Sequence, residues 1–247
     1  MAEASTYLLN IGNTRSAIAS GEFPEADAIA YYPTAELPRK WRLPVGATAT
    51  ASCVVPLVRQ RLAEQYAGRI HFIGVGDFPN LDVTGYDTST LGSDRLANAA
   101  AAQALLPGKA VLVFDCGTAL NSVAVDADGR LRGGVILPGR ETALRALSSA
   151  AALLPEYAVD APHQLNPLAI NTRAAILNGV DIGILGAAEA LIQRTRRCPG
   201  FEECTVWFTG GDAPFFVKYL PPELHAELPP VPLTLYGIRL ATRDRQN

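Results

Sequence analysis

The sequence predicts an α/β protein with two related halves, each containing a mixed β-sheet flanked by helices, and a cleft between the halves. Two observations favour this fold class. Short apolar strands alternate with helical segments, and one strand–turn–strand pattern occurs twice along the chain. Duplicated halves commonly bind ligands where they meet. We expect residues 1–108 to form the N-terminal half and residues 109–247 the C-terminal half.

The composition is that of a folded protein with a substantial core. Of the 247 residues, 49% are hydrophobic and 18% are charged, which excludes intrinsic disorder. The net charge of −3 and the lack of an extended basic cluster give no support to a nucleic-acid partner. The four cysteines form no CxxC pair and the three histidines are scattered, so we expect neither a disulfide framework nor a zinc site.

The sequence also gives no sign of a membrane partner. We find no apolar run close to the ~20 residues of a membrane span. The first residues, MAEASTYLLN, lack the basic and apolar regions of a signal peptide. We therefore expect a cytoplasmic protein.

In the first half, a β-hairpin is followed by strands and helices in alternation. Strands are expected at residues 7–10, from the Gly12-Asn13 turn to residue 19, and at 28–32, 47–55 and 71–75. Helices are expected at 56–67, which opens with a proline, and at the alanine-rich segment 93–106. The intervening segment 77–91 is rich in Asp, Thr, Gly and Pro and is predicted to be a loop.

The second half repeats this order. Strands are expected at 110–114, up to 125, and at 131–137, 205–209 and 233–236, with helices at 141–154, 172–197 and 214–219. The longest helical stretch contains Gly179, Gly183 and Gly186. These glycines are consistent either with a close helix–helix or subunit contact, or with a helix that is broken near residues 179–183.

Several common catalytic motifs are absent from the sequence. There is no P-loop, no Gly-x-Ser-x-Gly nucleophile elbow, and no complete dinucleotide-binding fingerprint after Gly74-Val75-Gly76. Hydride transfer and acyl-enzyme hydrolysis therefore lack their usual sequence signatures.

The two strand–turn–strand patterns carry similar residues at the turn. They read Leu9-Asn10-Ile11-Gly12-Asn13-Thr14 and Phe114-Asp115-Cys116-Gly117-Thr118-Ala119. Glycine lets the backbone approach a ligand closely, and successive N–H groups can bind a phosphate. An Asn or Asp at the strand end can hold a hydrated Mg²⁺ ion through oxygen. A tight hairpin alone would explain one such turn, but two in matching positions favour a phosphate site.

A third motif, Gly92-Ser93-Asp94-Arg95, begins the alanine-rich helix. Ser93 is the better candidate for the helix cap, which leaves Asp94 and Arg95 without a structural role. An aspartate that can accept a proton from an alcohol, beside an arginine that can bind a carboxylate, is typical of an acceptor site for phosphoryl transfer. The alternative is that Asp94 only stabilises the helix N-terminus.

Several short motifs, in this order, resemble those of the type III pantothenate kinases, a family in the superfamily of acetate and sugar kinases, Hsp70 and actin. The first turn is similar to the family motif Asp-x-Gly-Asn-Thr. The matching segments are 10–14, 51–56, Tyr86 with 92–95, 115–119, 133–139, 171–172 and 209–211. This resemblance covers nearly the whole chain and implies the duplicated, ribonuclease H-like fold of actin-like ATPases.

The resemblance also implies a reaction and its residues. A relative of this family would transfer a phosphoryl group from ATP to pantothenate, with Asp94 as the general base. Pantothenate would be held by Tyr86, Gly92, Arg95 and Thr172. Asp115 and Asn10 would help to bind Mg²⁺, and the phosphates would contact Asn10, Gly12, Asn13, Thr14, Gly117 and Thr118. Family members are homodimers that need a monovalent cation, K⁺ or NH₄⁺.

The sequence departs from the family pattern at Asn10, where the family carries aspartate. An amide oxygen can still coordinate Mg²⁺ but supplies no negative charge, and acetate kinases of the same superfamily also resemble this chain in having Asn there. Two interpretations follow: a working kinase with a relaxed metal site, or a non-catalytic relative that acts as a metabolite-binding regulatory protein. The presence of both Asp94 and Asp115 favours the kinase.

Overall fold

The computed structural model describes residues 6–20, 29–159 and 165–243, which form two compact units. Unit 1 contains the chain up to Lys109, the segment Val123–Gly133 and the chain from Pro229 onward. Unit 2 contains Ala110–Ser122 and Gly134–Leu228. Both units are therefore assembled from separate stretches of sequence. The division into halves at residues 108 and 109 stays a prediction.

Unit 1 is built on a five-stranded mixed sheet. Its strands follow the order β3-β2-β1-β4-β5, with β2 antiparallel to β1 and β3, and with β4 parallel to β1 and β5. The strands are β1 (Thr6–Ile11), β2 (Arg15–Ser20), β3 (Ala30–Pro33), β4 (Thr48–Cys53) and β5 (Ile70–Phe72). The predicted hairpin and the two later strands are thus confirmed; residue 28 of the predicted third strand lies outside the described residues.

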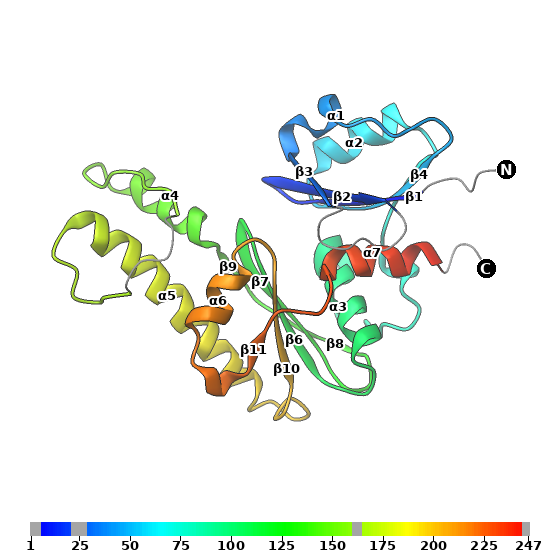
Figure 1. Cartoon of the computed structure of the whole chain (residues 1–247). Helices are drawn as coiled ribbons and strands as arrows, with labels where there is room; N and C mark the ends of the chain where they lie inside the picture. Colours follow the sequence, from blue (N-terminus) through cyan, green and yellow to red (C-terminus); the bar gives the residue numbers. More distant parts are fainter. Residues whose placement is uncertain (1–5, 21–28, 160–164, 244–247) are drawn as a thin grey trace. The chain divides into compact units, whose positions relative to one another are not determined.

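Helices cover both faces of this sheet (Figure 1). One face carries α1 (Leu37–Lys40) and α2 (Pro56–Gln65), and the other carries α3 (Ser93–Leu105) and α7 (Leu233–Arg243). Short 3-10 helices lie at Thr34–Glu36 (η2), Val75–Asp77 (η3) and Thr88–Thr90 (η4). The core between the sheet and α1–α2 includes the fully buried Leu9, Leu37 and Leu62.

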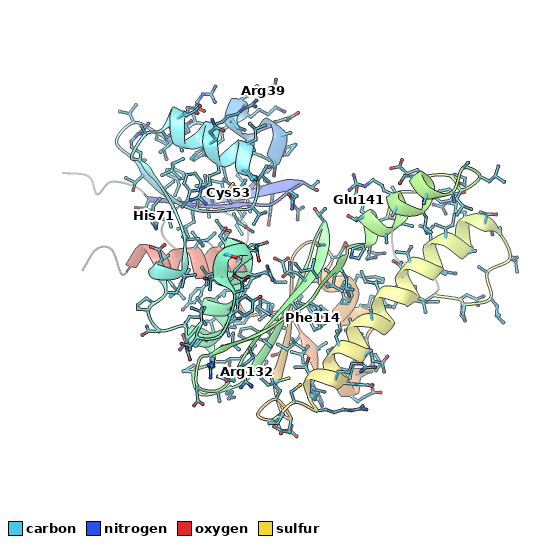
Figure 2. The ribbon with its side chains drawn as sticks, turned by 180° about the vertical axis from the view of Figure 1, so that it is seen from behind. Arg39, Cys53, His71, Phe114, Arg132 and Glu141 are labelled. Atoms are coloured by element: carbon cyan, nitrogen blue, oxygen red, sulfur yellow. The ribbon has the colours of Figure 1, made fainter. Side chains whose placement is uncertain are left out.

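Unit 2 contains most of a second mixed sheet. The order is β11-β10-β6-β7-β8, with β9 also paired to β7; β8 and the end of β7 belong to unit 1. The strands are β6 (Val111–Cys116), β7 (Ala119–Val125), β8 (Leu131–Gly133), β9 (Ile136–Pro138), β10 (Thr205–Thr209) and β11 (Ala226–Glu227). The parallel strands β6 and β10 carry Phe114 and Phe208, whose buried rings stack 4.7 Å apart (Figure 2 labels Phe114).

Three α-helices complete unit 2: α4 (Arg140–Ala150), α5 (Thr172–Thr195) and α6 (Ala213–Tyr219), with the 3-10 helix η5 at Pro222–Leu224. Helix α6 packs on β10 and β11, and Phe216 extends the aromatic stack at 5.1 Å from Phe208. Mixed sheets with helices in both units confirm the predicted α/β class.

Two predicted strands are wrong. Residues 131–137 form two short strands, β8 and β9, because Gly133 adopts a φ of +139° that interrupts the extended backbone. Residues 233–236 begin the helix α7 instead of a strand. Its buried residues Leu233, Ile238 and Ala241 follow a helical spacing that extends past Gly237, the point where a strand was expected to end.

Helix α5 runs without interruption through Gly179, Gly183 and Gly186, so the broken-helix interpretation is wrong. In the described part of the chain, nothing lies within 4 Å of a Cβ built at these glycines, so no close backbone contact uses them there. The helix is long and apolar enough to span a membrane by length and composition, although half of its most apolar window is buried. It packs against α4 within unit 2.

A buried ion pair joins these two helices. Arg140, the first residue of α4, donates from Nε and Nη2 to the two carboxylate oxygens of Asp181 on α5, at 2.7 and 2.8 Å. The side chains are only 7% and 5% exposed. The guanidinium also lies over the ring of Phe215 at 3.8 Å and 3.6 Å from a carboxylate oxygen of Asp212. The buried Arg140 charge is therefore compensated by the two-point pairing with Asp181 and by the contact with the Phe215 ring.

The close contact of α7 with α3 yields a first testable prediction. A Cβ at Gly237 would collide with the backbone of Ala97, which cannot move independently of α3. Gly237→Ala should therefore lower the free energy of unfolding of unit 1 by about 1–3 kcal/mol, despite the better helix propensity of alanine. Urea unfolding followed by Trp41 fluorescence in a Trp207→Phe background would measure this, because Trp41 belongs to the unit 1 core.

Gly76→Ala is the matched control for Gly237→Ala, since Gly76 is exposed and nothing lies within 4 Å of a Cβ there. We expect it to change stability by less than ~0.5 kcal/mol. Equal stability of the two alanine variants would contradict the tight α3–α7 contact.

The buried pair yields a second prediction. Asp181→Asn should destabilise unit 2 by about 3 kcal/mol, because the Arg140 charge would lose its two-point partner; the nearby Asp212 keeps the loss at the lower end of the usual range. The double variant Arg140→Met/Asp181→Leu should recover most of this loss. Urea unfolding reported by Trp207 in a Trp41→Phe background is the measurement.

Glu189→Gln makes the same acid-to-amide change at a half-buried position of α5, where the side chain contacts only Gln193 of the same helix in the bonds described, and should be nearly neutral. Purely additive effects of the Arg140→Met and Asp181→Leu changes would show that the two side chains do not interact.

Candidate functional site

The first predicted phosphate turn is held in shape by a neighbouring threonine. The Gly12 amide donates to the Arg15 carbonyl at 3.2 Å, which closes the β1–β2 hairpin. The buried Thr34 donates from its hydroxyl to the Gly12 carbonyl and contacts the Ser16 hydroxyl, both at 2.8 Å. Asn13 and Thr14 at the tip are exposed.

The acceptor motif is tied to the same edge of the unit 1 sheet. Asn10 near the end of β1 is in register with Ser52 on the parallel strand β4. The Ser52 and Ser93 hydroxyls lie 2.9 Å apart, and the Cys53 amide donates to the Ser93 hydroxyl at 3.0 Å. Because the C-terminal ends of parallel strands share one edge, this contact holds the N-terminus of α3 beside the strand that ends near Asn10. Figure 2 labels Cys53 at this position.

The prediction that Ser93 caps α3 is wrong. Gly92 is the N-cap residue and makes no side-chain capping bond, whereas Ser93 is the first residue of the helix and uses its hydroxyl for β4. Asp94 follows in the first turn, where the helix dipole favours a negative charge. A Cβ at Gly92 would collide with the Asp94 carboxylate, so the glycine leaves room for that side chain.

The structure brings the two predicted acceptor residues Tyr86 and Arg95 together. Arg95 donates from Nη1 to the Tyr86 hydroxyl and from Nη2 to the Thr90 carbonyl, each at a long distance of 3.4 Å. Both side chains are partly exposed. Arg95 therefore keeps donor capacity for an anionic group of a ligand.

The second predicted phosphate turn lies in unit 2 and contacts the start of α4. The Gly117 amide donates to the Ala119 carbonyl at 3.0 Å. The Thr118 carbonyl accepts from the Gly139 amide at 3.0 Å and from the Thr142 hydroxyl at 2.6 Å. A Cβ at Gly139 would collide with the Gly117 carbonyl, so only glycine permits this approach.

Asp115 lies near the end of β6, in register with Thr209 on β10. Gly210 follows with a φ of +92°, and a Cβ there would lie 2.7 Å from an Asp115 carboxylate oxygen. The Asp212 amide donates to the Cys116 carbonyl at 3.1 Å. Burial, with the nearby charges of Asp115 and Asp212, raises the pKa of the Cys116 thiol well above its usual value, so this thiol stays neutral. Burial also raises the pKa of the Asp212 carboxyl, although Arg140 opposes the shift.

The predicted site residues thus fall into two groups. Unit 1 carries Asn10, Gly12, Asn13, Thr14, Tyr86, Gly92, Asp94 and Arg95; unit 2 carries Asp115, Gly117, Thr118 and Thr172. Thr172 is exposed and begins α5 after Asn171, which accepts from the Ala174 amide at 2.9 Å. A site that combines both groups stays a prediction.

The predicted Mg²⁺ ligands, Asn10 and Asp115, would bind the ion through side-chain oxygen atoms. Among residues 6–20, 29–159 and 165–243 no three His, Cys, Asp or Glu side chains gather as a metal site. This sparse donor set fits Mg²⁺, which keeps several waters and binds through one or two carboxylates and substrate phosphates.

Sequence reasoning missed three residues that support these turns and the acceptor segment: Thr34, Arg130 and Arg140. Thr34 follows β3 and carries no motif of its own. Arg140 follows Gly139, the residue after β9, yet a buried arginine cannot be distinguished from an exposed one in a single sequence. Only the tertiary contacts identify them.

Known proteins similar to this chain are type III pantothenate kinases. The family model described as type III pantothenate kinase matches residues 8–194. A type III pantothenate kinase from Elusimicrobium minutum is 32% identical over 207 residues, covering 79% of this chain and 76% of that protein. Alignments with several other curated type III pantothenate kinases span only about half of each relative's length, at 49%, 51% and 48%.

Solved structures show the same fold at low identity. A Baf family protein from Campylobacter jejuni is 22% identical, with a TM-score of 0.63 and 98% and 99% of the two chains covered. The activator of the 2-hydroxyisocaproyl-CoA dehydratase from Clostridium difficile, solved with bound ADPNP, is 14% identical with a TM-score of 0.53, covering 98% and 97%. The chain has the fold of the actin-like ATPases, and by the match to its sequence model it belongs to the type III pantothenate kinase family.

Proposed function

We propose that this protein transfers the terminal phosphoryl group of ATP to the primary hydroxyl of pantothenate, giving ADP and 4'-phosphopantothenate in the first step of coenzyme A biosynthesis. The observation that carries this proposal is the Ser52–Ser93 contact, which ties Asp94 to the edge of the sheet where Asn10 and the first phosphate turn lie. In a chain of this family, a carboxylate beside a phosphate-binding turn supports phosphoryl transfer to an alcohol.

In the proposed acceptor site, Asp94 accepts the proton of the pantothenate hydroxyl. The hydroxyl oxygen then bonds to the γ-phosphorus as the bond from that phosphorus to the bridging oxygen breaks, and ADP leaves. Arg95 binds the pantothenate carboxylate, and Tyr86, Gly92 and Thr172 complete the site. The Tyr86–Arg95 contact supports a shared role for these two side chains.

In the proposed nucleotide site, Gly12, Asn13, Thr14, Gly117 and Thr118 bind the phosphates through backbone N–H groups and side-chain hydroxyls or amides. Asn10 and Asp115 would hold Mg²⁺, which neutralises charge on the phosphates when bound. The exposed positions of Asn13, Thr14 and Gly117 support this assignment. We propose that the nucleotide lies in a cleft between the halves 1–108 and 109–247. The family resemblance supports the further need for K⁺ or NH₄⁺.

We also propose a cytoplasmic homodimer that binds neither nucleic acid nor membrane. Leu153, Leu168 and Ile170 of unit 2 are large apolar side chains that are 94%, 80% and 98% exposed. A subunit contact at these three side chains would remove them from water. The glycines of α5, with open space around them, remain available to the same contact.

The proposed activity is tested by ADP release with ATP, Mg²⁺ and pantothenate, with and without K⁺. We expect release that depends on pantothenate and rises with K⁺. If no release occurs under any condition but calorimetry shows pantothenate or nucleotide binding, the alternative holds, and the protein is a non-catalytic, metabolite-binding regulator.

Asp94→Asn should lower kcat by about 10²–10⁴-fold while pantothenate binding persists, because the amide fills the same space but cannot accept the proton. Steady-state kinetics and calorimetry measure the two effects separately. Asp128→Asn, which makes the same change at an exposed turn, is the control and should retain full activity. Unchanged turnover in Asp94→Asn would remove this residue from the mechanism.

Asn10→Asp should lower the Mg²⁺ concentration needed for half-maximal rate by at least about fivefold, since a unit charge ~4 Å from an ion gains ~1 kcal/mol or more even in water. A Mg²⁺ titration at saturating ATP and pantothenate gives this value. Asn80→Asp adds the same charge on an exposed loop and should leave the titration unchanged. Identical Mg²⁺ curves for wild type and Asn10→Asp would show that position 10 does not contact the ion or its waters.

A further inference from the structure

The segment that carries Tyr86 is held against unit 1 at several points. It leaves η3, where Asp77 pairs with His71 at 2.8 Å, and reaches α3 at Ser93. Phe78 and Leu81 are buried at 6% and 5% exposure and anchor its first part. The part that follows, residues 82–90, is mostly exposed and has few apolar anchors of its own. Its conformation must therefore depend on polar contacts.

Those contacts come from the hairpin that joins β7 to β8. The Asp82 amide donates to the Gly129 carbonyl at 3.0 Å, and the Leu131 amide donates to the Asp82 carbonyl at 2.8 Å. These two bonds form an isolated parallel bridge between Asp82 and Arg130. Asp82 is thereby fixed to the hairpin at both of its backbone groups.

Arg130 extends this attachment toward Tyr86. Its guanidinium donates to the Thr84 carbonyl from Nε at 3.2 Å and from Nη2 at 3.0 Å. It also lies 3.6 Å from a carboxylate oxygen of Asp82. One arginine thus contacts two residues of the segment, from a hairpin turn that is distant in sequence.

Thr84 belongs to a tight turn that ends at Tyr86. The Tyr86 amide donates to the Val83 carbonyl at 3.0 Å, and Gly85 adopts a φ of +83°. A positive φ at the third residue is the mark of a type II turn, whose central carbonyl, here that of Thr84, points away from the turn. Without Arg130, this carbonyl could rotate with its peptide and change the direction in which the chain leaves toward Tyr86.

We propose that Arg130 is a positioning residue for the acceptor: it fixes the 83–86 turn and so sets the place of the Tyr86 hydroxyl, which accepts from Arg95. This inference rests on the proposed function, because it assigns a consequence for pantothenate binding. Arg130 itself need not touch the substrate. Its influence passes through Thr84 and Tyr86 to Arg95, whose guanidinium holds the Tyr86 hydroxyl at 3.4 Å.

A matched control lies two residues away on the same hairpin. Arg132, labelled in Figure 2, is 50% exposed against 43% for Arg130, and it pairs with Asp126 of its own hairpin at 3.1 Å. No bond from Arg132 to residues 82–90 exists among the described residues. Arg130→Ala and Arg132→Ala therefore remove the same charge and similar surface, but only the first releases the turn.

Arg130→Ala should raise the KM for pantothenate about tenfold, the usual effect of losing a charge-assisted hydrogen bond, while kcat and the KM for ATP change less than about twofold. Arg130→Lys should restore part of the loss, because one ammonium donor can still reach the Thr84 carbonyl. Arg132→Ala should match the wild type. A loss of kcat together with both KM values, or no change in the pantothenate KM, would overturn the proposal.

Amide hydrogen exchange tests whether Arg130 fixes the 83–86 turn without a measurement of activity. In Arg130→Ala, peptides covering residues 82–90 should exchange faster than in wild type and Arg132→Ala, while peptides from α3 stay unchanged. Unchanged exchange at 82–90 would overturn the inference even in an active kinase. Faster exchange at 82–90 in a protein that releases no ADP would support the role of Arg130 in fixing the turn and would reject only the proposed function.

Discussion

The candidate acceptor site depends on a single contact between a helix and a strand. The Ser93 hydroxyl binds the Cys53 amide and the Ser52 hydroxyl, at the end of β4. A strand end leaves such backbone groups without a ladder partner, and a buried unpaired amide is costly. Ser93 satisfies that amide and at the same time brings Asp94 to the sheet edge near Asn10. The same interaction thus stabilises the strand end and sets the location of the proposed base.

In unit 2, the second predicted phosphate turn is held by close glycine contacts and by a buried arginine. Gly139 and Gly210 allow backbone to approach the Gly117 carbonyl and the Asp115 carboxylate more closely than any side chain would permit. Arg140, directly after Gly139, pairs with Asp181 and lies near Asp212, so the chain around the second turn is joined to both α5 and the start of α6. Close approach and ion pairing together connect the second turn to its neighbours in unit 2.

The two turns differ in charge, and this difference concerns the proposed metal ion. Asp115 supplies a carboxylate, whereas Asn10 supplies a neutral amide at the matching position. Both are oxygen donors, so the geometry of a hydrated Mg²⁺ site is available to either. The loss of one negative charge weakens attraction for the ion without removing a ligand atom. For the proposed kinase, a higher requirement for Mg²⁺ is the expected chemical consequence.

The sequence by itself determined the α/β class, both hairpin turns and the family, because glycine positions, apolar periodicity and short motifs are local properties. It also identified Tyr86 and Arg95, which the structure brings together. Only the tertiary structure decided that residues 233–236 are helical, since these residues begin a helix that packs closely against α3, where Gly237 meets Ala97. The same holds for Ser93, Arg130 and Arg140, whose roles arise from partners distant in the chain. Local sequence specifies conformation, but a polar side chain acquires its role from the groups that folding places beside it.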